Sequence, residues 1–448
     1  MLIRLGAVAL LAAPLFGQWS LKEVVERAGR TNPGVQASME NAAAAAAGVR
    51  LARTAILPKG DALYQVNRAT RNNVFGMLLP NRVIAPISGP PLATNAGTNV
   101  WGTTAGFLIS WEPFDLGQRA ANVKSADAER VRNEKAVARE RFEIEAAAAD
   151  AYLSVVAADE LVKSAKANVE RASALETVIR AQVETGLKPG ADLERARAER
   201  AVADAQLIQA EQASRTTRAA LVRIAGGDVA EVAPVTAVLL AEPVAVGGGI
   251  GEHPFVTEQR AAIDVATARK KEADIAWRPK FEFQSALYAR GTGAHGDGAT
   301  GGAGAGLGPN IYNWGVGFNV TFPFLDLPVN RTQREIEGHR AAAAEARLRK
   351  VQQDLKAETL AAQASLDAAV RLSKTTPVQL QAARSAHEQA RARYQSGLTG
   401  VTEVAEAQRL LAQAEVDDGL ARLNVWRAQL GVAVASGDLA PFLQAVGQ

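Results

Sequence analysis

Apolar residues recur at seven-residue steps in the segment that follows Gly397. One seam position holds a run of large aliphatic residues, and alanines hold the other: Val404, Leu411, Val425 and Val432 form the aliphatic run. A seven-residue repeat predicts left-handed coiled-coil packing, and small residues at one seam let helices approach closely. Asp418 interrupts the aliphatic seam. The same pattern lies on both sides of Gly186, so the sequence predicts long helices joined in pairs at glycine turns.

Four shorter segments alternate large apolar residues with small or polar ones, at about residues 60–70, 99–111, 280–290 and 310–322. Such period-two segments of about ten residues are typical of strands in a membrane β-barrel, with the apolar face toward lipid. We expect these aromatic residues to face the membrane: Trp101, Trp111, Tyr312, Trp314, Phe318 and Phe322. The alternative is a sheet packed on the helices of a soluble protein.

Four strands are too few to close a barrel, for which about eight is the practical minimum. Open strand edges would leave backbone N–H and C=O groups without partners, which lipid does not tolerate. If the strands lie in a membrane, the protein must therefore oligomerise.

The chain contains two copies of one unit. Residues 31–35 (Thr-Asn-Pro-Gly-Val) resemble residues 252–256, and Pro33 and Pro58 recur as Pro254 and Pro279 at one shared offset of 221. We divide the chain into a signal peptide (1–17), a first repeat (18–226), a Pro/Gly-rich linker (227–252), a second repeat (253–438) and a C-terminal tail (439–448). The assignment of the signal peptide rests on Arg4 and on the apolar run that follows it. The alternative there is a buried N-terminal helix.

Two further features qualify the helices and loops. Pro377 lies inside the long helix expected in the second repeat and should kink or break it. Residues 291–308 are rich in glycine, and we expect them to form a flexible loop between two strands.

Composition excludes several functions. The chain of 448 residues has no cysteine, which removes disulfides, thiolate metal sites and an N-terminal lipid anchor. The net charge is +3, with acids and bases interspersed, so we expect no nucleic-acid partner. Gly296, Gly298 and Gly301 match a dinucleotide motif, but glycine and not a helix follows them. The histidines are scattered, and we expect no metal, no cofactor and no catalytic residue.

The sequence resembles the TolC-like outer-membrane efflux proteins. The resemblance rests on Asn32-Pro33, on the Pro-Phe-Asp-Leu-Gly exit at residues 113–117, on the two Gly-Leu turns, and on the order and duplication of these marks. It implies a mainly α-helical fold with a membrane β-barrel portion. In that fold three chains share a twelve-stranded β-barrel and an α-helical coiled-coil tunnel.

The resemblance also implies location, partners and function. Members lie in the outer membrane of Gram-negative-type bacteria with a large periplasmic portion. They dock onto a periplasmic adaptor (membrane fusion) protein and an inner-membrane pump. We expect a passive exit duct for small molecules or exported substrates, not an enzyme. The alternative is a soluble periplasmic coiled-coil scaffold or adaptor, which would not need the aromatic strands.

Residue roles carried over from the family concern the turn end of the helices. Glu403 and Glu406 match acidic residues that face the pore, as its gate and selectivity element. Asp192 and Tyr394 match two residues of a network that closes the periplasmic end in the family. The arginine usual in that network is replaced by Thr399, and Lys188 occupies the corresponding position of the first repeat. The turns expected to contact the adaptor are Gly186, Leu187, Gly397 and Leu398. The alternative for the charged residues is an ordinary solvated helix end.

Overall fold

The computed structural model describes residues 18–70, 99–186, 189–227, 233–234, 239, 252–295, 297 and 299–446. The expected signal peptide (1–17) and most of the expected linker (227–252) lie outside these residues. The chain divides into two compact units, which are described separately. Unit 1 comprises Met1–Asn41, Glu134–Gln259 and Arg347–Gln448, and unit 2 comprises Ala42–Asn133 and Arg260–Ala346.

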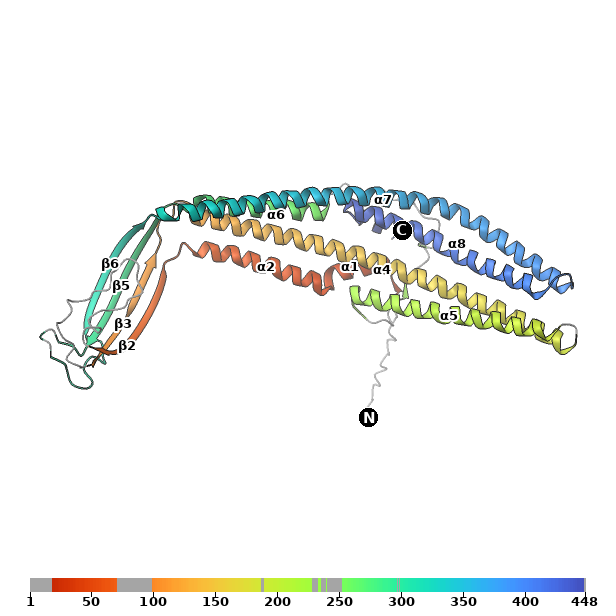
Figure 1. Ribbon diagram of the computed structural model, residues 1–448, viewed down its shortest axis with the longest axis horizontal. Helices are drawn as coiled ribbons and strands as arrows, with labels where there is room; N and C mark the ends of the chain where they lie inside the picture. Colours follow the sequence, from red (N-terminus) through yellow and green to blue (C-terminus); the bar gives the residue numbers. More distant parts are fainter. Residues whose placement is uncertain are drawn as a thin grey trace, which may run out of the picture. The chain divides into compact units, whose positions relative to one another are not determined.

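The same order of elements occurs twice along the chain (Figure 1). The first series is α2 (Pro33–Thr54), β2 (Lys59–Thr70), β3 (Asn99–Trp111), α4 (Gln118–Glu184) and α5 (Gly190–Ala225). The second is α6 (Pro254–Ile275), β5 (Lys280–Thr292), β6 (Ile311–Thr321), α7 (Leu327–Gln395) and α8 (Val401–Ser436). The remaining elements are β1 (Gln18–Trp19), α1 (Leu21–Thr31), β4 (Ala233–Pro234), η2 (Phe324–Asp326) and α9 (Ala440–Val446).

Each series begins with a polar residue that joins two helices. The Asn32 side chain accepts a hydrogen bond from the Gly34 N–H (2.8 Å) and donates one to the carbonyl of Ile224 (2.9 Å). His253 does the same at the start of α6, with Nδ1 accepting from the Phe255 N–H (3.2 Å) and Nε2 lying 3.2 Å from the Val434 carbonyl. Such a residue satisfies a free N–H at a helix start, and the proline that follows suits the first helical position.

The core of unit 1 lies where α1, α4, α5, α8 and α9 meet. Its fully buried side chains include Tyr152, Leu221, Trp426 and Phe442. The Tyr152 hydroxyl donates a hydrogen bond to the Trp19 carbonyl (2.8 Å), which satisfies a polar group inside the core. Most of the expected C-terminal tail therefore forms the short helix α9, which packs against α8 through Trp426 and Phe442.

Helix α7 is continuous through Pro377, so the expected break is absent. Beside it, Asp418 of α8 explains the interruption of the aliphatic seam. Asp418 is buried, accepts a hydrogen bond from the Thr376 hydroxyl of α7 (3.1 Å), and pairs with Arg422 at 3.4 Å. A buried carboxylate with such partners links two helices where an apolar residue would only pack.

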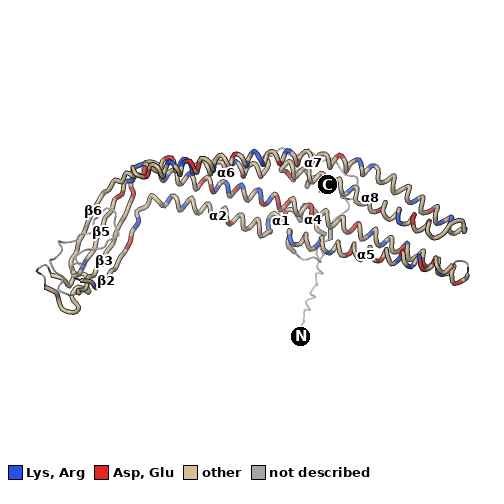
Figure 2. The backbone as a smooth tube through the Cα atoms, viewed as in Figure 1, with Lys and Arg blue, Asp and Glu red and all other residues tan. Residues whose placement is uncertain are grey.

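Unit 2 contains one antiparallel sheet with the strand order β2-β3-β5-β6. In each cross-strand row the residues share a face, as in the row Ala62, Phe107, Leu287 and Trp314. β2 and β6 form the edges, and within the described residues neither has a second partner strand. Charged residues are frequent along the helices, whereas β3 and β6 carry none (Figure 2).

The glycine-rich segment between β5 and β6, expected to be flexible, is held by backbone hydrogen bonds where it is described. The Gly293 N–H donates to the Trp101 carbonyl and the Gly301 N–H to the Gly293 carbonyl, both at 2.8 Å. A β-carbon on Gly291 would lie 2.0 Å from the Gly308 carbonyl oxygen. Glycine is thus required there by close backbone approach.

Candidate functional site

Residues beside both glycine turns share one small hydrophobic core in unit 1. The core is built from α4, α5, α7 and α8, and its buried members are Ile179, Ala196, Ala390, Tyr394, Val401 and Val404. Several of these occupy the seam positions of the heptad pattern, which places the two helix pairs against each other. The sequence-predicted site residues near the turns are therefore attached to one packed helix end.

The turns themselves have the conformation that glycine favours. Gly186 and Gly397 have φ of 76° and 74°, where a side chain would add strain. The Leu398 N–H donates to the Arg393 carbonyl (2.9 Å) and the Gly397 N–H to the Tyr394 carbonyl (3.0 Å), which closes α7 in a Schellman-type cap. The Leu398 side chain is 73% exposed. Leu187 and Lys188 lie outside the described residues.

Asp192 lies near enough to Tyr394 to act on it electrostatically, while their role in a closing network stays a prediction. Tyr394 is buried, and its hydroxyl donates a hydrogen bond to the Gln182 side chain at 3.1 Å. Burial, together with the nearby negative charge of Asp192, raises the pKa of Tyr394, so the phenol keeps its proton. The Thr399 hydroxyl is buried and lacks a hydrogen-bond partner among the described residues.

Glu403 and Glu406 lie in the first two turns of α8, three residues apart and so on neighbouring positions of one helix face. They differ in their partners. Glu403 pairs with Arg393 of α7 at 3.2 Å, both side chains being about half exposed. Glu406 is exposed and has no ion-pair partner in the described part of the chain. Arg393 was not predicted, because the family resemblance implies an arginine after Gly397 and not four residues before it.

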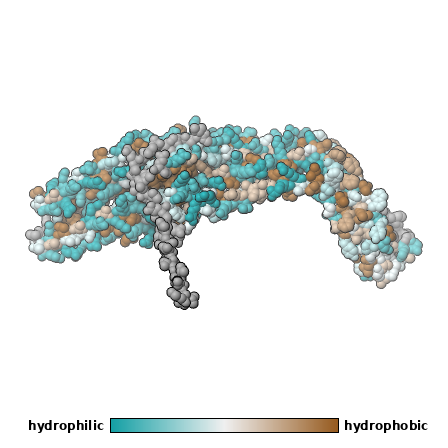
Figure 3. All heavy atoms as spheres, turned by 180° about the vertical axis from the view of Figure 1, so that it is seen from behind, coloured by the Kyte–Doolittle hydropathy of each residue, from teal (hydrophilic) through white to brown (hydrophobic). Residues whose placement is uncertain are grey.

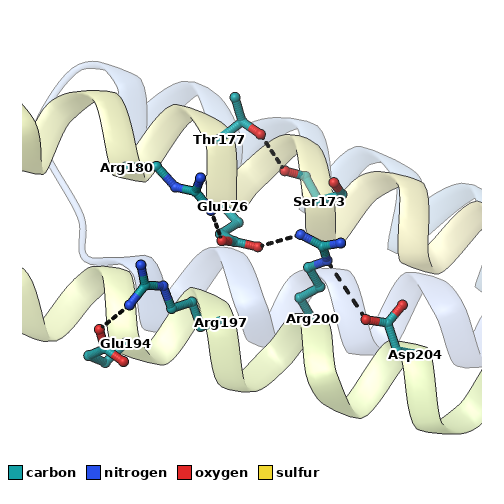
Figure 4. A network of polar contacts seen from close by, with 8 residues as sticks. All are labelled: Ser173, Glu176, Thr177, Arg180, Glu194, Arg197, Arg200 and Asp204. Atoms are coloured by element: carbon teal, nitrogen blue, oxygen red, sulfur yellow. Dashed lines mark hydrogen bonds and ion pairs between the residues drawn. The ribbon is translucent and has the colours of Figure 1, made fainter.

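A buried carboxylate connects α4 and α5 near the first turn (Figure 4). The Glu176 side chain is only 5% exposed and binds Arg180 of its own helix and Arg200 of α5, the latter at 3.1 Å. Arg200 also lies 3.7 Å from Asp204. The hydrogen bonds from Arg200 and then Arg180 lower the pKa of Glu176, which keeps the carboxylate charged. This network was not predicted from the sequence.

The sheet of unit 2 carries large apolar side chains on one face. Tyr312 and Trp314 are 84% and 77% exposed, and Phe318, Phe322 and Trp111 are also exposed. Trp101 is half-buried, with the Arg68 guanidinium 5.1 Å from its ring centre. Figure 3 shows the hydrophobic colouring over the sheet in the view from behind. On β6 the opposite face carries asparagine, glycine and threonine.

Within the described residues, no helix is both long enough and apolar enough to cross a membrane. Nor does that part of the chain contain a group of three or more His, Asp or Glu side chains placed to hold a metal ion. The arrangement of exposed aromatics on a sheet and charged residues at a helix end is suited to a channel protomer.

Solved channel structures share this fold. The outer-membrane channel CmeC of Campylobacter jejuni is 16% identical with a TM-score of 0.73, and the similarity covers 93% of this chain and 85% of that one. The outer-membrane protein VceC of Vibrio cholerae is 16% identical with a TM-score of 0.70, covering 93% and 96%. The MtrE channel of Neisseria gonorrhoeae is 16% identical with a TM-score of 0.68, covering 93% and 89%. No significant match was found among curated proteins.

The fold, mostly helical with a β portion, is thus that of outer-membrane channel protomers. The family model for outer membrane efflux proteins matches residues 24–227 and 250–438. The chain belongs to that family. The protein is therefore located in the outer membrane and serves as an exit duct of an efflux system. The soluble scaffold considered as an alternative does not account for this match.

Proposed function

We propose that three copies of the chain form one continuous passive duct. Their sheets combine into a twelve-stranded barrel, and their helices form a tunnel that opens into the periplasm at the glycine turns. The observation that carries this proposal is the four-stranded sheet whose edges, β2 and β6, have no further partner strand within the described residues. In lipid such edges must be paired, and pairing β6 of one copy with β2 of the next closes the barrel.

The exposed face of the sheet supports the same assembly. A buried aromatic side chain removes about 150–250 Å² from water, so a row of exposed aromatics is unfavourable in water and suits lipid. The opposite face of β6, with Asn313 and Asn319, then lines the lumen. Substrates would cross this polar-lined duct chemically unchanged, so the duct itself needs neither a cofactor nor a catalytic residue. A pump in the inner membrane would drive their transport.

The turn end is proposed to contact the periplasmic adaptor and to filter ions. Leu398 offers an exposed apolar contact at the end of α7, and Leu187 occupies the equivalent position of the first repeat. Threefold symmetry would bring three copies of Glu403 and three of Glu406 around one axis. Converging carboxylates attract cations and repel anions.

The assembly is tested by measuring the mass of the purified protein in detergent. We expect a stable trimer, and a stable monomer or dimer would contradict the proposal. Adaptor contact is tested with the variant Leu398→Asp, purified in the same way. This variant should still form the trimer but should no longer co-purify with the adaptor, because a carboxylate is unfavourable in an apolar contact. Leu360→Asp, at a similarly exposed leucine elsewhere on α7, is the matched control. Equal adaptor recovery with both variants would place docking elsewhere.

A further inference from the structure

A small pocket lies beside the second turn, where α4, α7 and α8 meet within unit 1. Its volume is about 120 Å³, well below the roughly 300–1,000 Å³ of sites for drug-sized ligands. Arg171 of α4 lines it together with His387 and Arg391 of α7, and none of the described residues that line it is acidic. Apolar side chains of α4 and α8 form much of the remaining wall. A pocket of this size with basic walls suits a small anion.

Two basic groups of the pocket lack partners in the described part of the chain. His387 and Arg391 lie four residues apart on α7 and therefore on one face of the helix. The half-buried ring of His387 makes no hydrogen bond there, and the exposed Arg391 makes no ion pair. Arg171, across the pocket, differs because Glu415 pairs with it at 2.7 Å. Donors for a ligand are thus present on the α7 wall.

The charges around the pocket favour a negatively charged ligand. Arg171 and Glu415 neutralise each other, which leaves Arg391 as the uncompensated charge of the wall. Burial, followed by the charges of Arg171 and Arg391, lowers the pKa of His387, and Glu388 and Glu415 oppose this only in part. The ring is therefore held neutral, and a metal cation is disfavoured for the same reason. An anion would offset the two arginines and let the ring take up a proton.

A buried amide contributes to the wall on α8. Gln408 is only 8% exposed, and its Nε2 donates a hydrogen bond to the Asn168 side chain of α4 at 3.3 Å. The Asn168 amide donates in turn to Gln206 of α5 at 3.5 Å. An amide nitrogen carries two hydrogens, so Gln408 keeps one for a ligand. This chain of amides orients Gln408 and links the pocket to both helix pairs.

We propose that this pocket binds one small oxyanion of the sulfate or phosphate kind. Arg391 and His387 donate hydrogen bonds to it from α7 and Gln408 from α8, while Arg171 contributes its charge from α4. These helices come from both repeats, so a bound anion ties the two helix pairs together beside the second turn. The site lies within one chain, and the inference depends neither on the proposed barrel nor on the proposed acidic rings.

Binding is measured by equilibrium dialysis of the purified full chain in detergent against radiolabelled sulfate, with chloride keeping the ionic strength constant. Sulfate is the probe because it carries two negative charges at both pH 6 and pH 8. We expect saturable binding of one sulfate per chain, tighter at pH 6 because His387 takes up a proton with the anion. Arg391→Gln should weaken binding about tenfold, a usual effect of losing a hydrogen bond between charged groups.

The matched control is Arg384→Gln, which removes an equal charge two turns earlier on α7 and should bind sulfate like the wild type. His387→Gln should keep binding at pH 8 but lose the tightening at pH 6. Arg391→Lys keeps the charge and should bind better than Arg391→Gln, which separates lost charge from lost folding.

Three results would overturn the inference. The first is the absence of saturable binding by the wild type. The second is an equal loss in Arg391→Gln and Arg384→Gln, which would indicate attraction by general surface charge and not by the pocket. The third is a His387→Gln variant that still binds more tightly at pH 6, which would place the responsive group elsewhere.

Discussion

The two repeats begin alike and diverge toward their turns. Asn32 contacts the start of α2 and the end of α5, and His253 contacts the start of α6 and the end of α8 in the same way. Ten residues before the turn glycines, however, the first repeat has Glu176 and the second has His387. Duplicated sequence has thus kept the contact that closes each repeat, while the charge near each turn has changed.

Both residues lie beside two arginines, but one residue is an acid and the other is a base. Glu176 is a charged acid held between two arginines. His387 lies beside Arg171 and Arg391, and burial, followed by the charges of those arginines, lowers its pKa, so that the ring stays neutral. Arg171 is itself neutralised by Glu415 of α8 at 2.7 Å. The acid near the first turn pairs with arginines of α4 and α5, whereas the histidine near the second turn lies beside Arg171 of the first repeat, whose charge is balanced by Glu415 of the second.

The largest effect is expected from removing the first of these charges. Glu176→Gln removes the anion that Arg180 and Arg200 share, and only Asp204, 3.7 Å from Arg200, remains beside them. The free energy of unfolding should fall by about 1–3 kcal/mol, the usual range for hydrogen bonds to charged groups, with solvent around both arginines limiting the loss. His387→Gln at pH 8 replaces one neutral polar group by another and should change stability by less than about 0.5 kcal/mol. Thermal unfolding at one fixed protein concentration compares them, and equal losses would show that the repeats do not differ here.

The strand exits give a second, smaller contrast. Asp115 follows β3 and accepts hydrogen bonds from the N–H groups of Gly117 (3.2 Å) and Arg119, which opens α4. Leu325, at the equivalent place after β6, has no such role and is exposed. Asp115→Ala should therefore cost about 1–2 kcal/mol as a lost helix cap.

The matched change Leu325→Ala should leave the free energy of unfolding within about 0.5 kcal/mol, because little of its surface is buried within the protomer. Both variants are measured by denaturant unfolding in the same detergent. A larger loss for Leu325→Ala would mean that this side chain is buried in the assembly.

Much of this architecture could be predicted from the sequence, because it follows from periodicity. The heptads that give α4, α5, α7 and α8, and the alternation that gives the strands, are visible over many residues. Contacts between helices were less accessible. Glu176 meets Arg200 only through the register of α4 against α5, and Arg393 meets Glu403 across a turn. Helix α9, with seven residues, is too short for periodicity to reveal.

Acid should separate the repeats further. The lowered pKa of His387 means that the unfolded chain binds a proton first, so stability is lost as the pH falls below the ordinary value of 6.5. His253 responds in the same direction, because burial lowers its pKa and protonation removes the Nδ1 acceptor. The lowered pKa of Glu176 stabilises the fold above the ordinary value of 4.5, and that contribution is lost only as the pH falls through its folded value.

Between pH 6.5 and 4.5 the second repeat should therefore weaken and the first should not. Glu145, whose pKa burial raises, would even favour the first repeat as it gains a proton. Hydrogen exchange at pH 7.5 and 5.5, corrected for intrinsic rates, follows peptides of α4 and α7 separately. In His387→Gln the peptides around position 387 should lose their response while those of α6 keep it. A uniform response of both repeats would refute the difference.

The smallest change in stability, and the most direct test of function, concerns the first turns of α5 and α8. Asp192 and Glu403 occupy equivalent positions, but three residues on the first repeat has Arg195 and the second has Glu406. Only the second repeat can thus supply two acidic rings to the proposed pore. Arg393 offsets part of the Glu403 charge at 3.2 Å, so Glu406 should contribute more to the field in the pore. Replacing either glutamate should cost at most about 1 kcal/mol, as is usual for exposed pairs.

In single-channel recordings across a salt gradient, Glu406→Gln should therefore reduce cation-over-anion permeability more than Glu403→Gln does. Arg393→Gln should increase it by freeing the Glu403 carboxylate. Asp192→Asn is the matched control from the first repeat, where Arg195 stands at the position of the second acid. If the double variant Glu403→Gln with Glu406→Gln keeps the permeability ratio of the wild type, these residues are solvated helix charges and do not line the constriction.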